Sequence, residues 1–102
     1  CADCGGVLKA DVTLFGEALP VGAMRRGTAA VVASSVVVVV GSSLEVAPAN
    51  LIPSIVKYRP FGKLVVLNLD ESGKDQADIF LQGSATDILP KLVDRAKELV
   101  KR

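Results

Sequence analysis

The sequence predicts an α/β fold in which helices flank a parallel sheet. Five consecutive valines at residues 36–40 are typical of a strand that is apolar on both faces, as strands of parallel sheets usually are. A helical segment separates them from a second apolar run at residues 63–69, and a crossover of this length joins parallel strands. Residues 84–101 carry apolar positions at helical spacing on one face, which predicts a closing amphipathic helix.

The composition limits what kind of protein this is. The chain has 102 residues, enough for one domain, with 50% hydrophobic but only 4% aromatic residues, so the core must consist of aliphatic side chains. The net charge of +1 argues against binding to nucleic acid or to an anionic membrane. The longest apolar stretch, residues 29–40, falls short of the roughly 20 residues that span a bilayer. We expect no signal peptide, because no basic segment precedes an apolar run at the start of the sequence, and we expect a cytoplasmic location, with an organelle or the nucleus as open alternatives.

The first half of the chain begins irregularly. Residues 1–10 contain both cysteines and two glycines and are expected to form a knuckle, and the first residue is Cys rather than Met, so we expect that this is not a natural chain start. Residues 12–15 predict a short strand. Residues 19–33 predict a helix, although its glycines each weaken it by about 1 kcal/mol relative to alanine. The valine strand then ends at the Gly-Ser-Ser turn of residues 41–43.

The second half alternates helices and strands more regularly. Its expected elements are a helix at 48–58, a turn at 59–62, a strand at 63–69, a polar loop at 70–76, a strand at 77–82 and the last helix. Pro53 should kink or restart the first of these helices, because proline lacks the amide hydrogen. Ser84 and Asp87 have the spacing of a capping box at the start of the last helix.

The valine strand also predicts that the fold is incomplete. In a sequential layout it lies at the sheet edge, where a flat apolar strand promotes aggregation. A pairing segment that this sequence does not contain is therefore expected. The two cysteines indicate the same, because two thiolates supply half of a tetrahedral Cys₄ zinc site.

Three polar turns follow the predicted strands and are candidates for a nucleotide site, since ligands of open α/β sheets bind at the carboxyl ends of strands. In the first turn, Gly41, Ser42 and Ser43 suit a phosphate, but a plain strand-to-helix turn explains them equally well. In the second, Asn68 and Asp70, with Glu71 beside them, suit ribose hydroxyls, although turn chemistry alone accounts for them. In the third, residues 83–85, a strand end and a helix cap are a sufficient explanation.

Two further features lie near the start of the chain. The Cys1 and Cys4 pair suits a structural zinc half-site better than a redox pair, because the glycines at residues 5 and 6 would break the helix that a redox motif opens. Phe15-Gly16-Glu17 is unusual for a loop, and the alternative is a strand end with one buried phenylalanine.

Taken together, these segments resemble the C-terminal half of a sirtuin, the family of NAD-dependent protein deacylases, over essentially the whole chain. The resemblance rests on five segments in the family's order: CADCGG at 1–6, DVTLFGE at 11–17 followed by Leu-Pro, VVVGSSLEVAP at 38–48, LNL at 67–69, and GSA at 83–85 followed by Leu89-Pro90. It implies residues 1–10 as the second half of a zinc knuckle. It also implies residues 11–102 as the C-terminal half of a Rossmann-like NAD-binding domain, a parallel sheet with flanking helices.

The resemblance implies a role for each candidate position. The residues implied to contact NAD, the co-substrate, are Gly41, Ser42, Ser43, Asn68, Asp70 and Ala85. Those implied to line the cleft for an acyl-lysine protein or peptide, which adds as a strand, are Val12, Leu14, Phe15, Gly16, Glu45 and Val46. Cys1 and Cys4 would be two of four ligands to a structural zinc.

Important family features lie outside this sequence. The Gly-Ala-Gly loop, the Gln-Asn-x-Asp segment and the catalytic histidine of sirtuins are absent, and the chain contains no histidine. The resemblance therefore implies no catalytic residue in this chain, which would be inactive without the N-terminal half of the fold. Protein ADP-ribosyl transfer on the same scaffold and a non-catalytic nucleotide-binding module stay open as alternatives.

Overall fold

The computed structural model describes residues 1–101. Its three α-helices are α1 (Val21–Val32), α2 (Leu51–Ser54) and α3 (Ala85–Val100), and its 3₁₀-helices are η1 (Ile55–Tyr58) and η2 (Lys74–Gln76). The strands are β1 (Val36–Val40), β2 (Lys63–Asn68) and β3 (Ile79–Gln82). This order of elements is an α/β arrangement, as the sequence predicts.

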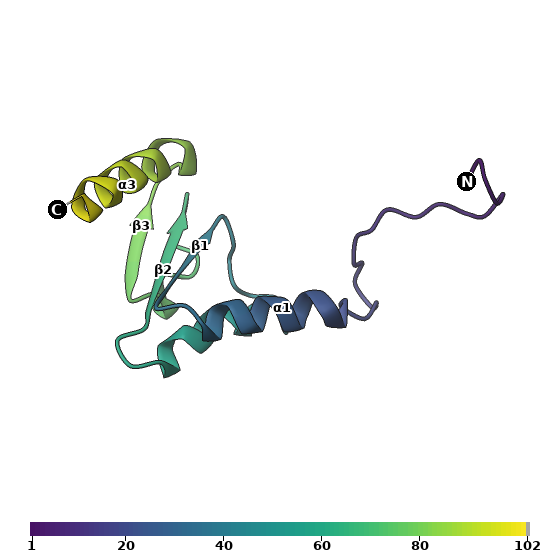
Figure 1. The fold of residues 1–102 in the computed structure, drawn as a ribbon, viewed down its shortest axis with the longest axis horizontal. Helices are drawn as coiled ribbons and strands as arrows, with labels where there is room; N and C mark the ends of the chain where they lie inside the picture. The colour runs from purple at the N-terminus through teal and green to yellow at the C-terminus, as the bar shows by residue number, and fades with distance from the viewer. Residues whose placement is uncertain (102) are drawn as a thin grey trace.

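The strands form one parallel sheet in the order β1-β2-β3 (Figure 1). Val40 of β1 is in register with Leu67 of β2, and Asn68 of β2 is in register with Gln82 of β3. The α2–η1 segment provides the crossover from β1 to β2. Because all three strands run in the same direction, the loops that follow them meet at one edge of the sheet.

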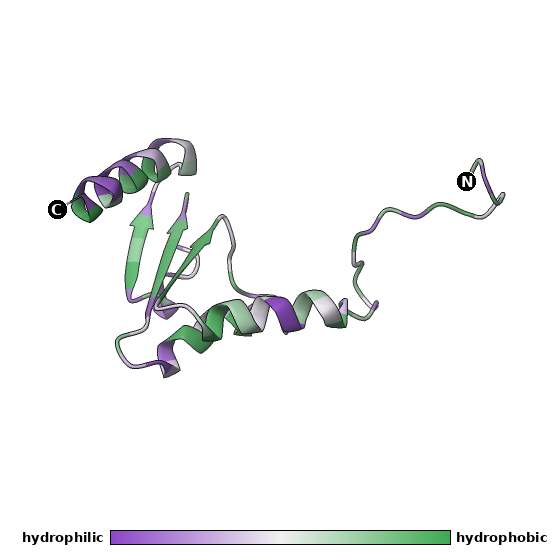
Figure 2. Cartoon of the chain, in the orientation of Figure 1, coloured by the Kyte–Doolittle hydropathy of each residue, from purple (hydrophilic) through white to green (hydrophobic). Residues whose placement is uncertain are grey.

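One cluster of buried side chains lies on one face of the sheet. The strands themselves are strongly apolar (Figure 2). The buried members of the cluster are Leu44, Val56, Leu64 and Val66. Val31 of helix α1 packs against this cluster. Val37 and Val39 of β1 also pack against it, from the face of the strand opposite to Val36, Val38 and Val40. Strand β2 is nevertheless buried on both faces after Lys63. Leu64 and Val66 belong to this cluster, while Val65 and Leu67, which are 8% and 1% exposed, lie on the opposite face.

The other face of β1 is open to solvent. Val36, Val38 and Val40 are 54%, 42% and 40% exposed, although β-branched residues of this kind are normally buried in a sheet. β1 also lies at the sheet edge, with β2 as its one neighbour among residues 1–101. Both observations agree with the sequence prediction that this strand lacks a partner.

Helix α3 is amphipathic but buries none of its residues (Figure 2). Leu92, Val93 and Leu99 on its apolar side are 39%, 45% and 51% exposed. The predicted capping box does not form, because the Ser84 hydroxyl lies 2.8 Å from the Thr86 hydroxyl instead of bonding to the backbone. The helix itself forms where the sequence predicts it.

Residues 1–20 contain no helix or strand and extend away from the sheet as a tail (Figure 1). The predicted strand at residues 12–15 is wrong, because within residues 1–101 no strand lies beside them to pair with. By contrast, the change from α2 to the 3₁₀-helix η1 just after Pro53 matches the predicted interruption. No helix within residues 1–101 is both long enough and apolar enough to cross a membrane.

Candidate functional site

The turns that follow β1 and β2 meet at the carboxyl edge of the sheet and line an open cavity of about 230 Å³. We call it the polar cavity, because five of its seven lining residues have polar side chains. The sequence-predicted residues that line it are Gly41, Ser42, Ser43, Asn68 and Asp70. Ala85 lines a neighbouring cavity of about 270 Å³ that shares Gly41 and Asn68 with the first. The structure therefore brings all six candidates for nucleotide contact to one edge.

Asn68 is the central polar residue of this edge. Its side chain is 5% exposed, and Nδ2 donates hydrogen bonds to the backbone carbonyls of Ser42, at 2.8 Å, and of Ser72. These two bonds use both amide hydrogens, so Oδ1 is the atom left to accept from a ribose hydroxyl. Asn68 thus ties the β1 turn to the β2 turn.

Asp70 provides the negative charge of the site. Hydrogen bonds from Ser72 lower the pKa of the Asp70 carboxyl, and the side chain of Ser72 has the larger effect and its backbone the smaller one. The backbone nitrogen of Ser72 lies 2.9 Å from Asp70 Oδ1. The carboxyl group is exposed and remains ionised at neutral pH. It can accept hydrogen bonds from sugar hydroxyls.

Two glycines shape the turns. Gly41 has φ +67°, and a Cβ at this position would meet no atom within 4 Å, so the requirement for glycine here is conformational. Gly73 has φ +80°, and a Cβ there would lie 3.1 Å from Val66 Cγ1 and 3.5 Å from Leu44 Cδ1. The second turn therefore packs closely beneath Leu44 of the first.

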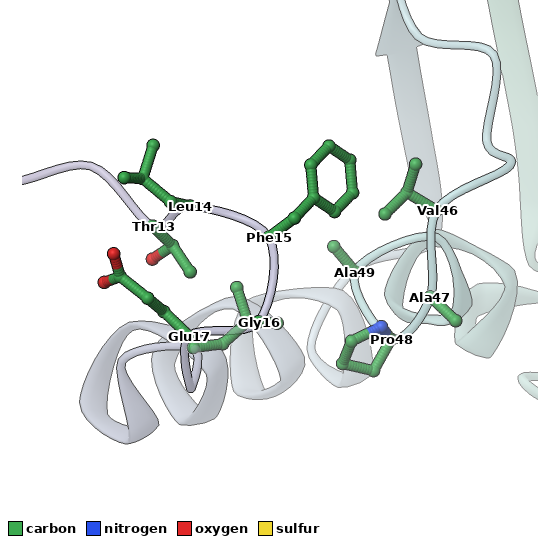
Figure 3. A pocket seen from close by; sticks show the side chains of 10 residues that line it. Thr13, Leu14, Phe15, Gly16, Glu17, Val46, Ala47, Pro48 and Ala49 are labelled. Atoms are coloured by element: carbon green, nitrogen blue, oxygen red, sulfur yellow. The ribbon is translucent and has the colours of Figure 1, made fainter.

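A second pocket of about 280 Å³ forms between the tail and the segment that leads into α2. Among the substrate candidates, Leu14, Phe15, Gly16 and Val46 line it. The Phe15 ring is directed toward Val46 and Ala49 (Figure 3). Phe15 is 93% exposed, so the alternative of a buried phenylalanine at a strand end is wrong.

The remaining two substrate candidates lie outside this pocket. Glu45 lines a different cavity of about 310 Å³, together with Ser42, Ser43 and Val46. Val12 is 59% exposed, and its carbonyl accepts a hydrogen bond from Lys9. The structure thus separates these two positions from the Phe15 pocket.

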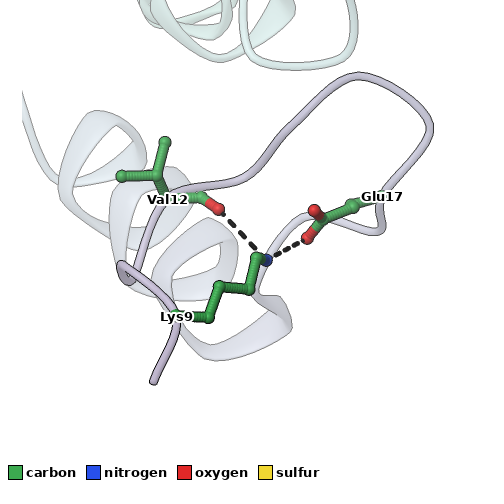
Figure 4. Close-up of polar contacts among 3 residues, drawn as sticks. All are labelled: Lys9, Val12 and Glu17. Atoms are coloured by element: carbon green, nitrogen blue, oxygen red, sulfur yellow. Dashed lines mark hydrogen bonds and ion pairs between the residues drawn. The ribbon is translucent and has the colours of Figure 1, made fainter. Parts of the chain in front are cut away.

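Lys9 holds together the ends of the loop that carries Phe15 (Figure 4). Its Nζ lies 2.6 Å from Glu17 Oε2 and 3.4 Å from the carbonyl oxygen of Val12. The Lys9 and Glu17 side chains are 58% and 39% exposed, and exposed pairs of this kind stabilise a fold by less than about 1 kcal/mol. The pair therefore contributes more to the shape of the loop than to stability.

Both cysteines lie in a tight turn at the start of the tail. The Cys1 carbonyl accepts from Gly5 N at 2.9 Å, and Gly6 N lies 3.4 Å from Cys4 Sγ. Both thiols are free and exposed. Within residues 1–101, no group of three or more potential ligands surrounds them. The turn thus offers two sulfur ligands, which is half of a tetrahedral site.

The structure adds site residues that the sequence interpretation missed. Leu44 has φ +59° and is 5% exposed, Ser72 bonds both Asn68 and Asp70, and Asn50 Nδ2 donates to the Leu44 carbonyl at 3.0 Å. Asn50 directly follows the apolar Val-Ala-Pro-Ala segment at residues 46–49. A polar residue in such an apolar stretch was a signal from which the sequence could have indicated a role for Asn50. Nothing in the sequence indicates the left-handed backbone of Leu44.

The comparisons with known proteins agree with this geometry. A family model described as the Sir2 family matches residues 1–48. The chain is 43% identical over 101 residues to NAD-dependent protein deacetylase 1 of Pyrobaculum aerophilum, a match that covers 98% of the chain and 39% of that protein. It is 40% identical over 101 residues to the NAD-dependent protein deacylase of Thermococcus kodakarensis, with the same coverage of 98% and 39%.

Solved structures match over the same length. A Sir2 homologue mutant in complex with ADP ribose superposes with a TM-score of 0.89 and 34% identity, covering 99% of this chain and 41% of that one. Sir2Af2 bound to a myristoylated histone peptide has a TM-score of 0.85 and 33% identity, covering 99% and 43%. The chain thus spans about two fifths of the length of these relatives. Because sequence and backbone agree over nearly its whole length, the chain belongs to the Sir2 family.

Proposed function

We propose that this chain is the C-terminal part of an NAD-dependent protein lysine deacylase. Such an enzyme transfers the acyl group from a lysine side chain to the ADP-ribose part of NAD and releases nicotinamide. The observation that carries the proposal is that one loop, residues 41–46, contributes to both the polar cavity beside Asn68 and the apolar pocket beside Phe15. A reaction between a nucleotide and a peptide side chain requires two such sites side by side.

At the polar cavity, this chain would hold the adenosine side of NAD. The backbone and hydroxyl groups of Ser42 and Ser43 would donate to phosphate oxygens, while Asn68 Oδ1 and the Asp70 carboxylate would accept from ribose hydroxyls. The Ala85 backbone would lie against the adenine. NAD itself supplies the bond to nicotinamide whose cleavage drives the transfer. Complexes of Sir2 relatives with ADP ribose support this assignment.

At the apolar pocket, this chain would hold the substrate peptide. An extended peptide would add as a strand between the tail and the 41–46 loop. Val12, Leu14, Phe15 and Gly16 would lie on one side of it, and Glu45 and Val46 on the other. Relatives solved with a p53 peptide and with a myristoylated histone peptide support a peptide in this family's cleft.

Residues 1–10 would form the second half of a structural zinc knuckle. Two observations fit this assignment: the thiols of Cys1 and Cys4 lie within one tight turn, and Gly6 N–H faces Cys4 Sγ at 3.4 Å. An amide hydrogen near a sulfur is a contact that orients and stabilises a thiolate ligand. The other two ligands would come from a different part of the complete protein.

Residues 11–102 would form the C-terminal half of a Rossmann-like domain whose N-terminal half supplies the missing parts. The exposed valines of β1 and the exposed apolar side of α3 support such a partner, as does the coverage of about two fifths of each relative. The chain has no histidine, so the general base that acts on the ribose would lie in that other half.

A chimaera tests this proposal. The chain would replace the matching 101-residue segment of the Pyrobaculum aerophilum deacetylase. We expect the chimaera to release nicotinamide from NAD only when an acyl-lysine peptide is present and to form acylated ADP-ribose, detected by mass spectrometry. We expect the 102-residue chain alone to be inactive.

Other products would point to the alternatives. ADP-ribose attached to the peptide would indicate a transferase, and binding of ADP-ribose without turnover in a folded chimaera would indicate a binding module. Either result contradicts the deacylase proposal. Zinc content gives an independent test of the knuckle: we expect one zinc ion in the chimaera and its loss on substitution Cys4→Ser.

A further inference from the structure

The 41–46 loop forms a wall shared by two pockets. Ser42 and Ser43 face the polar cavity with Asn68, and Val46 faces the apolar pocket with Phe15. Asn50 lines a third cavity of about 310 Å³, which shares Ser42 and Ser43 with the polar cavity and Val46 with the apolar pocket. Whatever fixes the shape of this loop therefore sets the shape of both pockets at once.

The middle of the loop has an unfavourable backbone conformation. Leu44 has φ +59°, a region that branched and bulky residues rarely adopt. Its side chain is buried in the core cluster, and its N–H lies 3.2 Å from Ser42 Oγ. These contacts anchor the side chain and the amide nitrogen but leave the carbonyl oxygen of Leu44 to be held by another residue.

Asn50 provides that contact. Its Nδ2 donates to the Leu44 carbonyl at 3.0 Å across six residues of sequence, and its backbone N donates to the Val46 carbonyl at 3.1 Å. The side chain therefore connects the start of the α2 segment to the strained residue, and the backbone connects it to the end of the loop.

The other end of the Asn50 amide indicates that this contact has a purpose beyond packing. Oδ1 is buried and has no hydrogen-bond partner within residues 1–101. A buried amide oxygen without a donor is unfavourable, and an apolar residue such as the adjacent Ala49 or Leu51 would avoid that cost. In the part of the chain that the structure describes, the bond to Leu44 is thus the one favourable polar contact of this side chain.

We propose that Asn50 is a positioning residue that holds the 41–46 loop in the shape needed by both pockets. This inference rests on the proposed function, since it assigns nucleotide and peptide to the two sides of the loop. Asn50 acts through Leu44 and contacts neither ligand. Loss of the Asn50 side chain should therefore weaken the binding of both ligands. Loss of a residue that touches only one ligand should weaken the binding of that ligand alone.

The first test compares three variants of the chimaera. We expect Asn50→Ala to lower the affinity for ADP-ribose and the affinity for the acyl-lysine peptide, each by about ten-fold, which corresponds to about 1.4 kcal/mol of binding free energy. Ser43→Ala should lower the affinity for ADP-ribose alone, and Phe15→Ala should lower the affinity for the peptide alone. Calorimetric titrations of each ligand give the affinities. An Asn50→Ala variant that weakens one ligand only, or neither, would overturn the proposal.

The second test uses Asn50→Asp, which keeps the size of the side chain. The carboxylate cannot donate to the Leu44 carbonyl, whereas the protonated acid can. We therefore expect the weakened binding to recover as the pH falls through the carboxyl pKa, with no such recovery in the Asn50→Ala variant. Glu45 is the ionisable residue that lines the same cavity, so the experiment is repeated with Glu45→Gln present. Absence of recovery at low pH would count against the hydrogen bond.

The third test does not depend on the proposed function. In the 102-residue chain, the NMR amide signals of residues 42–46 should shift on Asn50→Ala and return toward the wild-type positions in Asn50→Asp at low pH. Unchanged signals would refute the role of Asn50 directly. If the wild-type chimaera binds neither ligand, the deacylase proposal fails, and these spectra still decide whether Asn50 shapes the loop.

Discussion

Unfavourable residue conformations concentrate between β1 and α2. Gly41 and Leu44 both have positive φ, at +67° and +59°, and Asn50 carries a buried amide oxygen that has no hydrogen-bond partner among residues 1–101. Each feature opposes folding slightly, and burial of Leu44 beside Val66 and Gly73 compensates. Strain of this kind is commonly retained where a loop must present backbone groups to a ligand.

Gly41 provides a test of this strain at a single residue. We expect Gly41→Ala to lower the free energy of unfolding by about 1 kcal/mol, because alanine disfavours a left-handed backbone. Gly27→Ala is the matched control: Gly27 lies inside α1, a Cβ there meets no atom within 4 Å, and alanine should raise stability by about 0.5–1 kcal/mol. Urea unfolding measures both. Equal effects of the two substitutions would argue against strain at Gly41.

At the scale of elements, the buried and exposed surfaces are distributed unevenly. β2 is buried along almost its entire length, whereas α3 buries no residue and β1 is half-buried on one face and exposed on the other. The central strand therefore carries most of the stability of the chain. The outer elements present apolar surface that suits contact with further polypeptide.

Substitutions in β2 and α3 should reveal this contrast. Leu64 is fully buried, and Leu64→Ala should destabilise the 102-residue chain by about 2–5 kcal/mol. Leu92 is 39% exposed, and Leu92→Glu should change the stability of the chain by no more than about 0.5 kcal/mol. In the chimaera, where other segments can cover α3, Leu92→Glu should destabilise clearly. Chemical unfolding of both proteins makes the comparison, and a large effect in the chain alone would show that α3 already packs there.

At the scale of the whole molecule, the chain is elongated. Its extents are 57 × 29 × 29 Å and its radius of gyration is 17.2 Å, against about 13 Å for a compact domain of this length. The tail of residues 1–20 accounts for the excess (Figure 1). The edge strand β1, whose outer edge is open within residues 1–101, also exposes apolar side chains to solvent.

This open edge predicts self-association of the isolated chain. We expect Val38→Lys to lower the mean mass in sedimentation velocity, because a charge on an edge strand opposes strand pairing between molecules. Val7→Lys places the same charge on a fully exposed tail residue and should leave the mass unchanged. If both substitutions act equally, net charge rather than the strand edge governs association.

The sequence was sufficient for the order of elements and for most of the residues at the two pockets. The valine run predicts β1, helical spacing predicts α3, and the polar turns after β1 and β2 predict the edge of the sheet at which the polar cavity lies. The predicted strand at residues 12–15 was wrong because an alternating pattern becomes a strand only when a neighbour pairs with it. The roles assigned to the individual site residues, the zinc half-site and the cytoplasmic location stay predictions.

Elements such as β1 and α3 could be recognised from sequence because their periodicity and turn residues act over a few neighbouring positions. The hydrogen bonds and packing contacts around the 41–46 loop could not be recognised from sequence in this way. Asn68 reaches the Ser42 carbonyl across 26 residues of sequence, and Gly73 packs against Leu44 from a different turn. Contacts of this kind exist only after the parallel strands align their carboxyl ends, so tertiary structure decided how the loop is held and which pockets it joins.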